Sequence, residues 1–234
     1  MVRRNVISFT EREILRLGDA LADAGLLLDR NFAHTYLLGG RVTRLAWNNY
    51  SISAVTEFAT VQEYISLIRD RQYTYVFFDG SLMQVVYYFR NRRIVQHNLG
   101  FYSPPVPILP DALREYLDYG LTLQDLVIDR VESDDFASNL RLKSPIRFDF
   151  DAHNNTVDHP ASHLHLSQSD CRIAVSAPLS IGHFVRFVFR YFYPEHWKQC
   201  QFIRRWPCID FQETIMSQQK KLLHIGCARQ SSVI

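Results

Sequence analysis

The sequence predicts an α+β protein, in which an antiparallel sheet carries helices packed on one face. Short runs of alternating apolar and polar residues predict the strands, and longer runs with an apolar stripe at helical spacing predict the helices. Turn residues separate the alternating runs, which favours antiparallel pairing of neighbouring strands. The 234 residues contain no clear linker and no internal repeat, so a single α+β domain over residues 1–234 is expected.

Five parts are expected in chain order. They are a helical N-terminal part (1–70), a β-meander (73–102), a helical connector (110–131), a histidine- and aspartate-rich sheet with a buried helix (144–197), and a C-terminal helix (209–225). In the first part, Thr60 and Glu63 form a capping box that starts a helix, whereas residues 29–41 are expected to form a loop. In the meander, Asp79-Gly80 favours a tight hairpin turn.

The densest polar pattern lies between residues 144 and 193. Ile146 to Asp151 alternates strictly, His163 to Ser167 repeats the alternation, and Cys171 to Ser176 provides a third such run. Because successive side chains of a strand point to opposite faces, three neighbouring antiparallel strands would share one apolar face. The opposite face would collect the polar residues, namely Arg147, Asp149, Asp151, His163, His165 and Arg172.

The most apolar helix is expected from Ile181 to about Tyr193, with Ser180 as its N-cap. Aromatic and β-branched residues cover most of its circumference, so the helix should be deeply buried. A narrow basic stripe remains, formed by His183, Arg186 and Arg190. The partner of this stripe is either a carboxylate of the sheet or a phosphate group, and for Arg190 we expect a carboxylate of the sheet.

Composition limits the classes of function. A formal net charge of +2 excludes a protein that binds nucleic acid by bulk charge, but it leaves a local basic groove open. The four cysteines have no C-x-x-C spacing, which argues against a cysteine-ligated zinc site. The sequence shows no signal peptide and no apolar run of membrane-spanning length, so a cytoplasmic location and no membrane partner are expected.

His163 and His165 lie at alternate positions of one predicted strand, so their side chains project together. With His159, or with Asp149 and Asp151, they could bind a divalent metal ion, and imidazole ligands favour zinc. The alternative is structural: His163 bonds a backbone carbonyl beside Pro160, and His165 pairs with Asp149. The sequence leaves both interpretations open, and with them the identity of any cofactor.

The same histidines could cleave RNA without a metal. Imidazole titrates near neutral pH, so one histidine can take the proton of the 2′-hydroxyl while another protonates the leaving oxygen. Nearby guanidinium groups would bind the phosphate and stabilise its developing charge. The candidate phosphate-binding residues are Arg147, Arg172 and Arg186.

Several short motifs resemble those of a family of uncharacterised bacterial proteins known only as a domain of unknown function. The motifs are D-G-S-L-x-Q from Asp79, R-F-D-F-D from Arg147, H-P-x-S-H-L-x-L from His159 and C-R-I-x-V-S from Cys171. The resemblance covers roughly residues 10–197. The segment from Asp149 to His165 is also similar, more distantly, to the H-P-x-x-H-x-H segment of small toxins from bacterial toxin–antitoxin modules. The resemblance implies a bacterial protein often encoded near mobile elements or defence genes.

Two functions are expected from these observations. The first is a nucleic-acid-processing, RNase-like effector or subunit of a bacterial defence or toxin-type module, with a protein partner from the same operon. His163 would act as base or ligand, His165 and His159 would assist, and Asp149 and Asp151 would orient the imidazoles or hold metal. The second is a non-catalytic interaction subunit of a defence complex, in which the polar cluster is a buried structural network.

Overall fold

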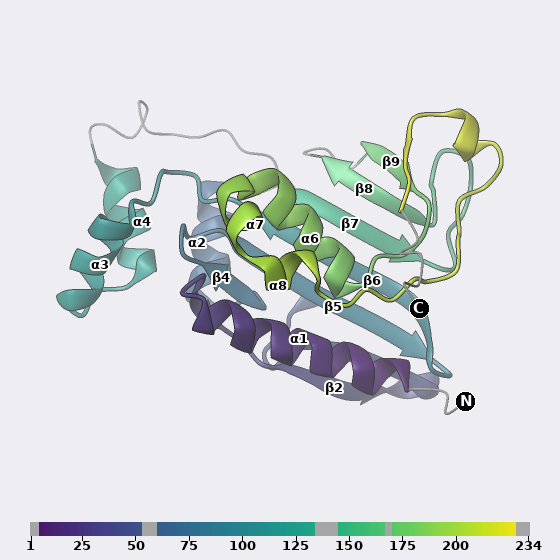
Figure 1. Ribbon diagram of the computed structural model, residues 1–234, viewed down its shortest axis with the longest axis horizontal. Helices are drawn as coiled ribbons and strands as arrows, with labels where there is room; N and C mark the ends of the chain where they lie inside the picture. The colour runs from purple at the N-terminus through teal and green to yellow at the C-terminus, as the bar shows by residue number, and fades with distance from the viewer. Residues whose placement is uncertain (1–4, 53–59, 134–144, 167–169, 228–234) are drawn as a thin grey trace.

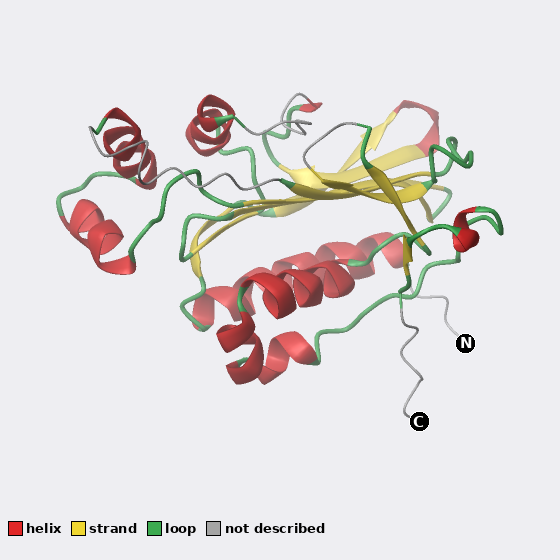
Figure 2. Cartoon of the chain, turned by 90° about the horizontal axis from the view of Figure 1, so that it is seen from above, coloured by secondary structure: helices red, strands yellow, loops and turns green. Residues whose placement is uncertain are grey.

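The computed structural model describes residues 5–52, 60–133, 145–166 and 170–227. A ten-stranded sheet lies between two groups of helices (Figure 1, Figure 2). The predicted α+β class, built on a mainly antiparallel sheet, is confirmed. The helices were expected on one face of the sheet, but they pack against both faces. The last residue of one predicted strand, Ser167, lies outside the described residues.

The strands lie in both halves of the chain. They are β1 (Leu27–Arg30), β2 (Ala33–Leu38), β3 (Val42–Trp47), β4 (Tyr75–Phe77), β5 (Leu82–Arg90), β6 (Arg93–Tyr102), β7 (Ile146–Asp151), β8 (Ser162–Leu166), β9 (Arg172–Val175) and β10 (His224–Ile225). The helices are α1 (Val6–Asp23), α2 (Val61–Arg69), α3 (Pro110–Asp118), α4 (Leu123–Glu132), α6 (Ile181–Phe192), α7 (Pro194–Gln199) and α8 (Gln201–Arg204), with short 3-10 turns η1 (Gly39–Arg41) and η3 (Gln219–Lys221).

The sheet has the strand order β1-β4-β5-β6-β7-β8-β9-β10. β5 is long enough to pair β4 along its first residues and β3 along its last ones, and β2 extends the sheet beyond β3. Neighbours are antiparallel except β10, which runs parallel to β9. The predicted meander corresponds to β4, β5 and β6, and the polar stretch supplies β7, β8 and β9 in adjacent positions.

The two faces of the sheet bury different apolar clusters. The larger cluster packs α1, α6, α7 and α8 against one face, where Phe148 of β7 contacts Phe184 and Phe187 of α6. The smaller cluster packs α2, α3 and α4 against the opposite face at the end near β4 and β5, where Val76 and Val86 are buried. The rest of that second face carries the polar residues of β6, β7 and β8.

Local signals explain where several helices begin and end. The Thr60 hydroxyl accepts the Glu63 N–H, and the Glu63 carboxylate accepts the Thr60 N–H, so the capping box starts α2 as predicted. Ser180 caps the start of α6, and Tyr193, immediately before Pro194, is its C-cap. Among the described residues, the structure contains no helix with the length and hydrophobicity that crossing a bilayer requires.

Two expectations about local structure are wrong. The loop expected over residues 29–41 contains the end of β1 and all of β2. The helix expected over residues 209–225 does not form, because residues 206–216 are irregular and only η3 and β10 follow. The Ile209 N–H donates to the Ser180 hydroxyl (3.2 Å) and the Thr214 N–H to the Ser176 carbonyl (2.9 Å), so long-range bonds replace helical ones.

Candidate functional site

Strand register brings the predicted acid and imidazoles together. In the β7–β8 pair, Asp149 lies opposite His163 and Arg147 lies opposite His165. In the β6–β7 pair, Asn98 lies opposite Asp149. Because the intervening Phe148 faces α6, these polar side chains all project from the other face of the sheet.

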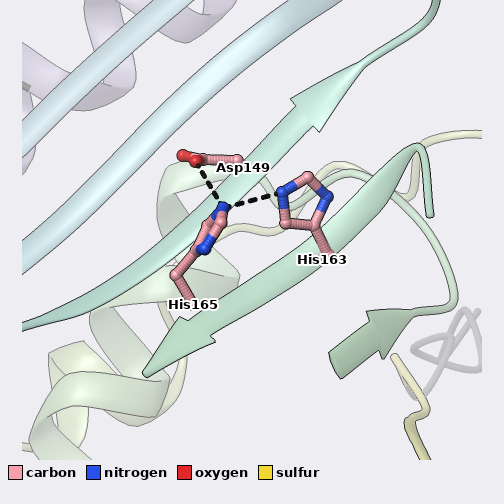
Figure 3. A group of neighbouring side chains, drawn as sticks. All are labelled: Asp149, His163 and His165. Atoms are coloured by element: carbon pink, nitrogen blue, oxygen red, sulfur yellow. Dashed lines mark hydrogen bonds and ion pairs between the residues drawn. The ribbon is translucent and has the colours of Figure 1, made fainter. Parts of the chain in front are cut away.

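The side chains of Asp149, His163 and His165 converge on a small volume, as Figure 3 shows. The Nε2 atoms of His163 and His165 are 2.9 Å apart, and His165 Nε2 lies 3.3 Å from Asp149 Oδ2. One ligand atom from each residue lies within 4.8 Å of the others. We call these three residues the DHH cluster.

The hydrogen bonds of His163 define its tautomer. Its Nδ1 atom lies 2.6 Å from the carbonyl oxygen of Pro160, which can only accept a hydrogen bond, so Nδ1 carries a proton. Burial lowers the pKa of His163 to about 4, despite the nearby charge of Asp149, so the ring is neutral near pH 7. A neutral ring protonated at Nδ1 directs the lone pair of Nε2 toward His165 and Asp149.

Asp149 is held as a carboxylate by its neighbours. Arg147 Nε donates to Oδ2 at 2.7 Å, and Asn98 Nδ2 donates to Oδ1 at 3.0 Å. Burial alone would raise the pKa of Asp149, but the hydrogen bond from His165, the charge of Arg147 and the bond from Asn98 lower it to about 2. The DHH cluster therefore combines a fixed negative charge with a neutral imidazole.

Other predicted residues lie at the border of the cluster. The His159 ring stands edge-on to His163, with 5.2 Å between ring centroids. Arg172 lies opposite His165 in the β8–β9 pair and forms an ion pair with the exposed Asp170 at 3.3 Å. Both residues therefore lie next to the imidazoles, and their contact with a ligand stays a prediction.

Three predicted partners do not join the cluster. Asp151 accepts bonds from the turn that follows β7, namely from the His153 N–H and the Asn154 amide, both at 2.9 Å. Arg186 belongs to α6 on the other side of the sheet, where it donates to Cys208 Sγ. The expected pairing of Arg190 with a carboxylate of the sheet is wrong, because this residue is exposed and lies over the Tyr191 ring.

Sequence reasoning missed several residues on the polar face. Asn98 contacts Asp149 directly, although only the β6–β7 register could reveal this. The Tyr88 hydroxyl donates to the Tyr50 hydroxyl at 3.4 Å, and Arg44 lies over the Tyr50 ring. Burial, the bond to Tyr88 and the charge of Asp149 raise the pKa of Tyr50, so this ring lies within electrostatic reach of the cluster.

His97 illustrates the opposite case, a histidine with a structural role. Its Nδ1 atom bonds the Phe148 carbonyl at 3.1 Å, and its Nε2 atom accepts the Leu179 N–H at 3.0 Å. The residue is 1% exposed and faces α6, away from the DHH cluster. Both ring nitrogens are satisfied by backbone groups, so His97 fixes the contact between β7 and the segment before α6.

The arrangement allows three kinds of chemistry. The DHH cluster can be a buried hydrogen-bonded network, a carboxylate–imidazole relay for proton transfer, or a ligand set of two imidazoles and one carboxylate for a divalent ion. Within the parts of the chain that the structure describes, no other group of histidine, cysteine or acidic side chains has this convergence.

Comparison with known proteins gives a family. No match was found among curated proteins or among solved structures. A protein family described as an uncharacterized conserved protein, DUF2290, matches residues 26–227. This range contains all ten strands, from β1 to β10, and the whole DHH cluster. The chain therefore belongs to the DUF2290 family of uncharacterized conserved proteins.

Proposed function

We propose that this protein is a nucleic-acid-processing, RNase-like effector or subunit of a bacterial defence or toxin-type module, with the DHH cluster as its reactive centre. The observation that carries the proposal is the convergence of Asp149 Oδ2 and the two Nε2 atoms of His163 and His165. The place in a defence module is supported by the motif resemblance alone.

The chemistry follows from the charges around the cluster. Cleavage of a phosphodiester needs a group that activates an attacking oxygen and cations that stabilise the charge developing on phosphorus. The imidazoles supply the first, and Arg172, opposite His165 on β9, supplies the second. Arg147, opposite His165 on β7, lies beside the same site in its ion pair with Asp149. The attacking oxygen gives its proton to the imidazole pair and bonds to phosphorus, and the leaving oxygen takes up a proton from His159 as its bond to phosphorus breaks.

The two imidazoles act as one unit in this proposal. Their ring centroids are 4.6 Å apart and their Nε2 atoms are in hydrogen-bond contact, so no phosphate fits between them. A base and an acid on opposite sides of the scissile bond would need separated rings. The pair therefore serves a single task, the activation of the attacking oxygen, and His159 is the candidate for the second proton transfer.

The test is cleavage of end-labelled single-stranded RNA and DNA, with divalent ions and with a chelator. The informative variant is His163→Asn, because the Asn amide can replace the Nδ1 donor to Pro160 while the Nε2 position is lost. The matched control is His153→Ala, which changes an exposed histidine of the turn after β7. We expect RNA cleavage by the wild type and the control, and a loss of at least about 100-fold in His163→Asn.

Equal activity of wild type and His163→Asn, or no cleavage of either polymer by wild type under any condition, would contradict the proposal. Thermal unfolding of each variant is measured alongside. A rate loss counts only if His163→Asn remains folded at the assay temperature.

The non-catalytic interaction subunit is supported by a separate observation. His163 and His165 are only 4% and 7% exposed, and Arg147 forms a 2.7 Å ion pair with Asp149. In this case the cluster contributes to stability, and breaking it costs about 3–5 kcal/mol, or a fall in Tm of about 6–20 °C at about 2–4 °C per kcal/mol. Loss of stability without any cleavage by the wild type would favour this second function.

A further inference from the structure

We propose that the DHH cluster binds a divalent transition-metal ion of the zinc class, with an open position for a phosphodiester oxygen. The inference rests on the proposed function for its substrate, although metal binding itself can be measured independently. With the ion bound, the two imidazoles would serve as ligands, and the ion would take over the activation of the attacking oxygen. Two imidazole nitrogens and one carboxylate oxygen are a ligand set that catalytic zinc sites use, with the remaining position left for water or substrate.

Two of the three ligand distances in the cluster are close to those of such an ion. Zinc binds nitrogen and oxygen ligands at about 2.0–2.2 Å, so two ligands of a tetrahedral ion are separated by about 3.3 Å. The two Nε2 atoms of the cluster are 2.9 Å apart, and His165 Nε2 is 3.3 Å from the Asp149 oxygen. The ligand atoms of His163 and Asp149 lie within 4.8 Å of each other. Admitting the ion therefore requires an opening of a few tenths of an ångström between the two rings and a closer approach of His163 to Asp149.

The positions of the protons in the cluster also favour an ion between the three side chains. His163 directs a lone pair at His165, because its proton is on Nδ1. The single Nε2 proton of His165 then faces two acceptors, His163 Nε2 and Asp149 Oδ2. The two Nε2 atoms and Asp149 Oδ2 thus surround a single proton, the one on His165 Nε2. A divalent cation accepts an electron pair from all three atoms at once.

The surrounding hydrogen bonds are those of a supported metal site. His163 donates its other ring N–H to the Pro160 carbonyl, which fixes the ring with Nε2 pointing inward. Asp149 receives Asn98 on Oδ1 and Arg147 on Oδ2, and an oxygen of a carboxylate can accept one such bond while it binds a metal. These partners orient two of the three ligands before any ion arrives.

Charge and exposure point to an anionic substrate. The negative charge of Asp149 is balanced by Arg147, so the charge of a bound divalent ion stays uncompensated by the protein ligands. The side chains of Asp149 and His165 are 13% and 10% solvent-exposed, so solvent reaches the edge of the cluster. An uncompensated cation with an open position attracts a phosphodiester oxygen, and Arg172 at the border adds a second positive charge.

The test is titration of the full chain with Zn²⁺ by calorimetry, and with Co²⁺ as a spectroscopic probe of the ligands. We expect one ion per chain and Co²⁺ bands of nitrogen and oxygen coordination without a thiolate charge-transfer band. His165→Asn, which removes the Nε2 position, should lose binding by at least about 100-fold, and Asn98→Ala should weaken it about 10–100-fold through Asp149. His153→Ala, the exposed control, should bind as the wild type does.

Three results of the binding experiments would decide against the site. Unchanged affinity in His165→Asn, thiolate bands with Co²⁺, or no saturable binding by the wild type would overturn the proposal. Asp149→Asn provides a second ligand variant of unchanged size if His165→Asn unfolds. RNA cleavage that persists in chelator would overturn the metal site and leave the proposed function standing. Stoichiometric zinc binding without RNA cleavage would support the metal site and overturn the proposed function.

Discussion

The buried histidine of the core, His97, should make the protein sensitive to mild acid. Burial lowers its pKa to about 4, because a charged ring would lose hydration between Phe148 and Leu179. In the unfolded chain the pKa returns to about 6.5. Between these two values the unfolded state binds the proton and the folded state does not, so the free energy of unfolding falls as pH falls.

The size of this effect follows from the two pKa values. The difference between about 6.5 and about 4 corresponds to about 3 kcal/mol, at about 1.4 kcal/mol per pKa unit. The loss begins near pH 6.5 and is complete near pH 4. Above pH 6.5 both states hold a neutral ring, so His97 adds no pH dependence there.

The assay is urea unfolding at several pH values between 7.5 and 5 for wild type and His97→Gln. The Gln side chain does not titrate, and its amide offers a donor and an acceptor toward Phe148 and Leu179. We expect the free energy of unfolding to fall less steeply with decreasing pH in the variant, by about 1.2 kcal/mol per pH unit near pH 5.5. Parallel curves for the two proteins would refute the assignment of this acid sensitivity to His97.

Two further predictions test local packing and capping. Gly182→Ala places a Cβ 2.0 Å from the Pro207 carbonyl oxygen, so we expect a loss of about 3 kcal/mol and a fall in Tm of about 6–12 °C. Gly226→Ala is the control, because its Cβ would meet no atom within 4 Å, and its free energy of unfolding should stay within about 0.5 kcal/mol of the wild-type value. Equal melting curves for the two variants would contradict the close packing of Gly182 against Pro207. Thr60→Ala removes the hydroxyl that accepts the Glu63 N–H and should cost about 1 kcal/mol in chemical unfolding, and an unchanged midpoint would show that the capping box is unimportant.

Local patterns in the sequence were sufficient for part of the fold. Strict alternation in Ile146–Asp151 and in the residues after Ser162 identified which side chains share a face, because side-chain direction in a strand has a period of two. The Thr60 capping box and the Ser180 cap were equally local signals. Such features depend on residues a few positions apart, which a single sequence displays directly.

Other features depend on contacts between distant parts of the chain. Asn98 meets Asp149 only through the register of β6 against β7, and a shift of one residue would turn each side chain to the other face. The C-terminal segment has an apolar stripe suited to a helix, yet it extends along α6 because Ser180 bonds the Ile209 N–H. Arg186 was expected with the cluster because the sequence does not show which face of the sheet α6 covers.

The most direct test of the central claim is the rate of RNA cleavage against zinc equivalents added to metal-free protein. If the DHH cluster is a metal-dependent reactive centre, the cleavage rate rises until one equivalent of zinc per chain has been added and then stays constant. The cleavage rate of Asp149→Asn does not rise with added zinc. A rate that is zero at every zinc level, or one that is the same without zinc and in Asp149→Asn, would contradict the account.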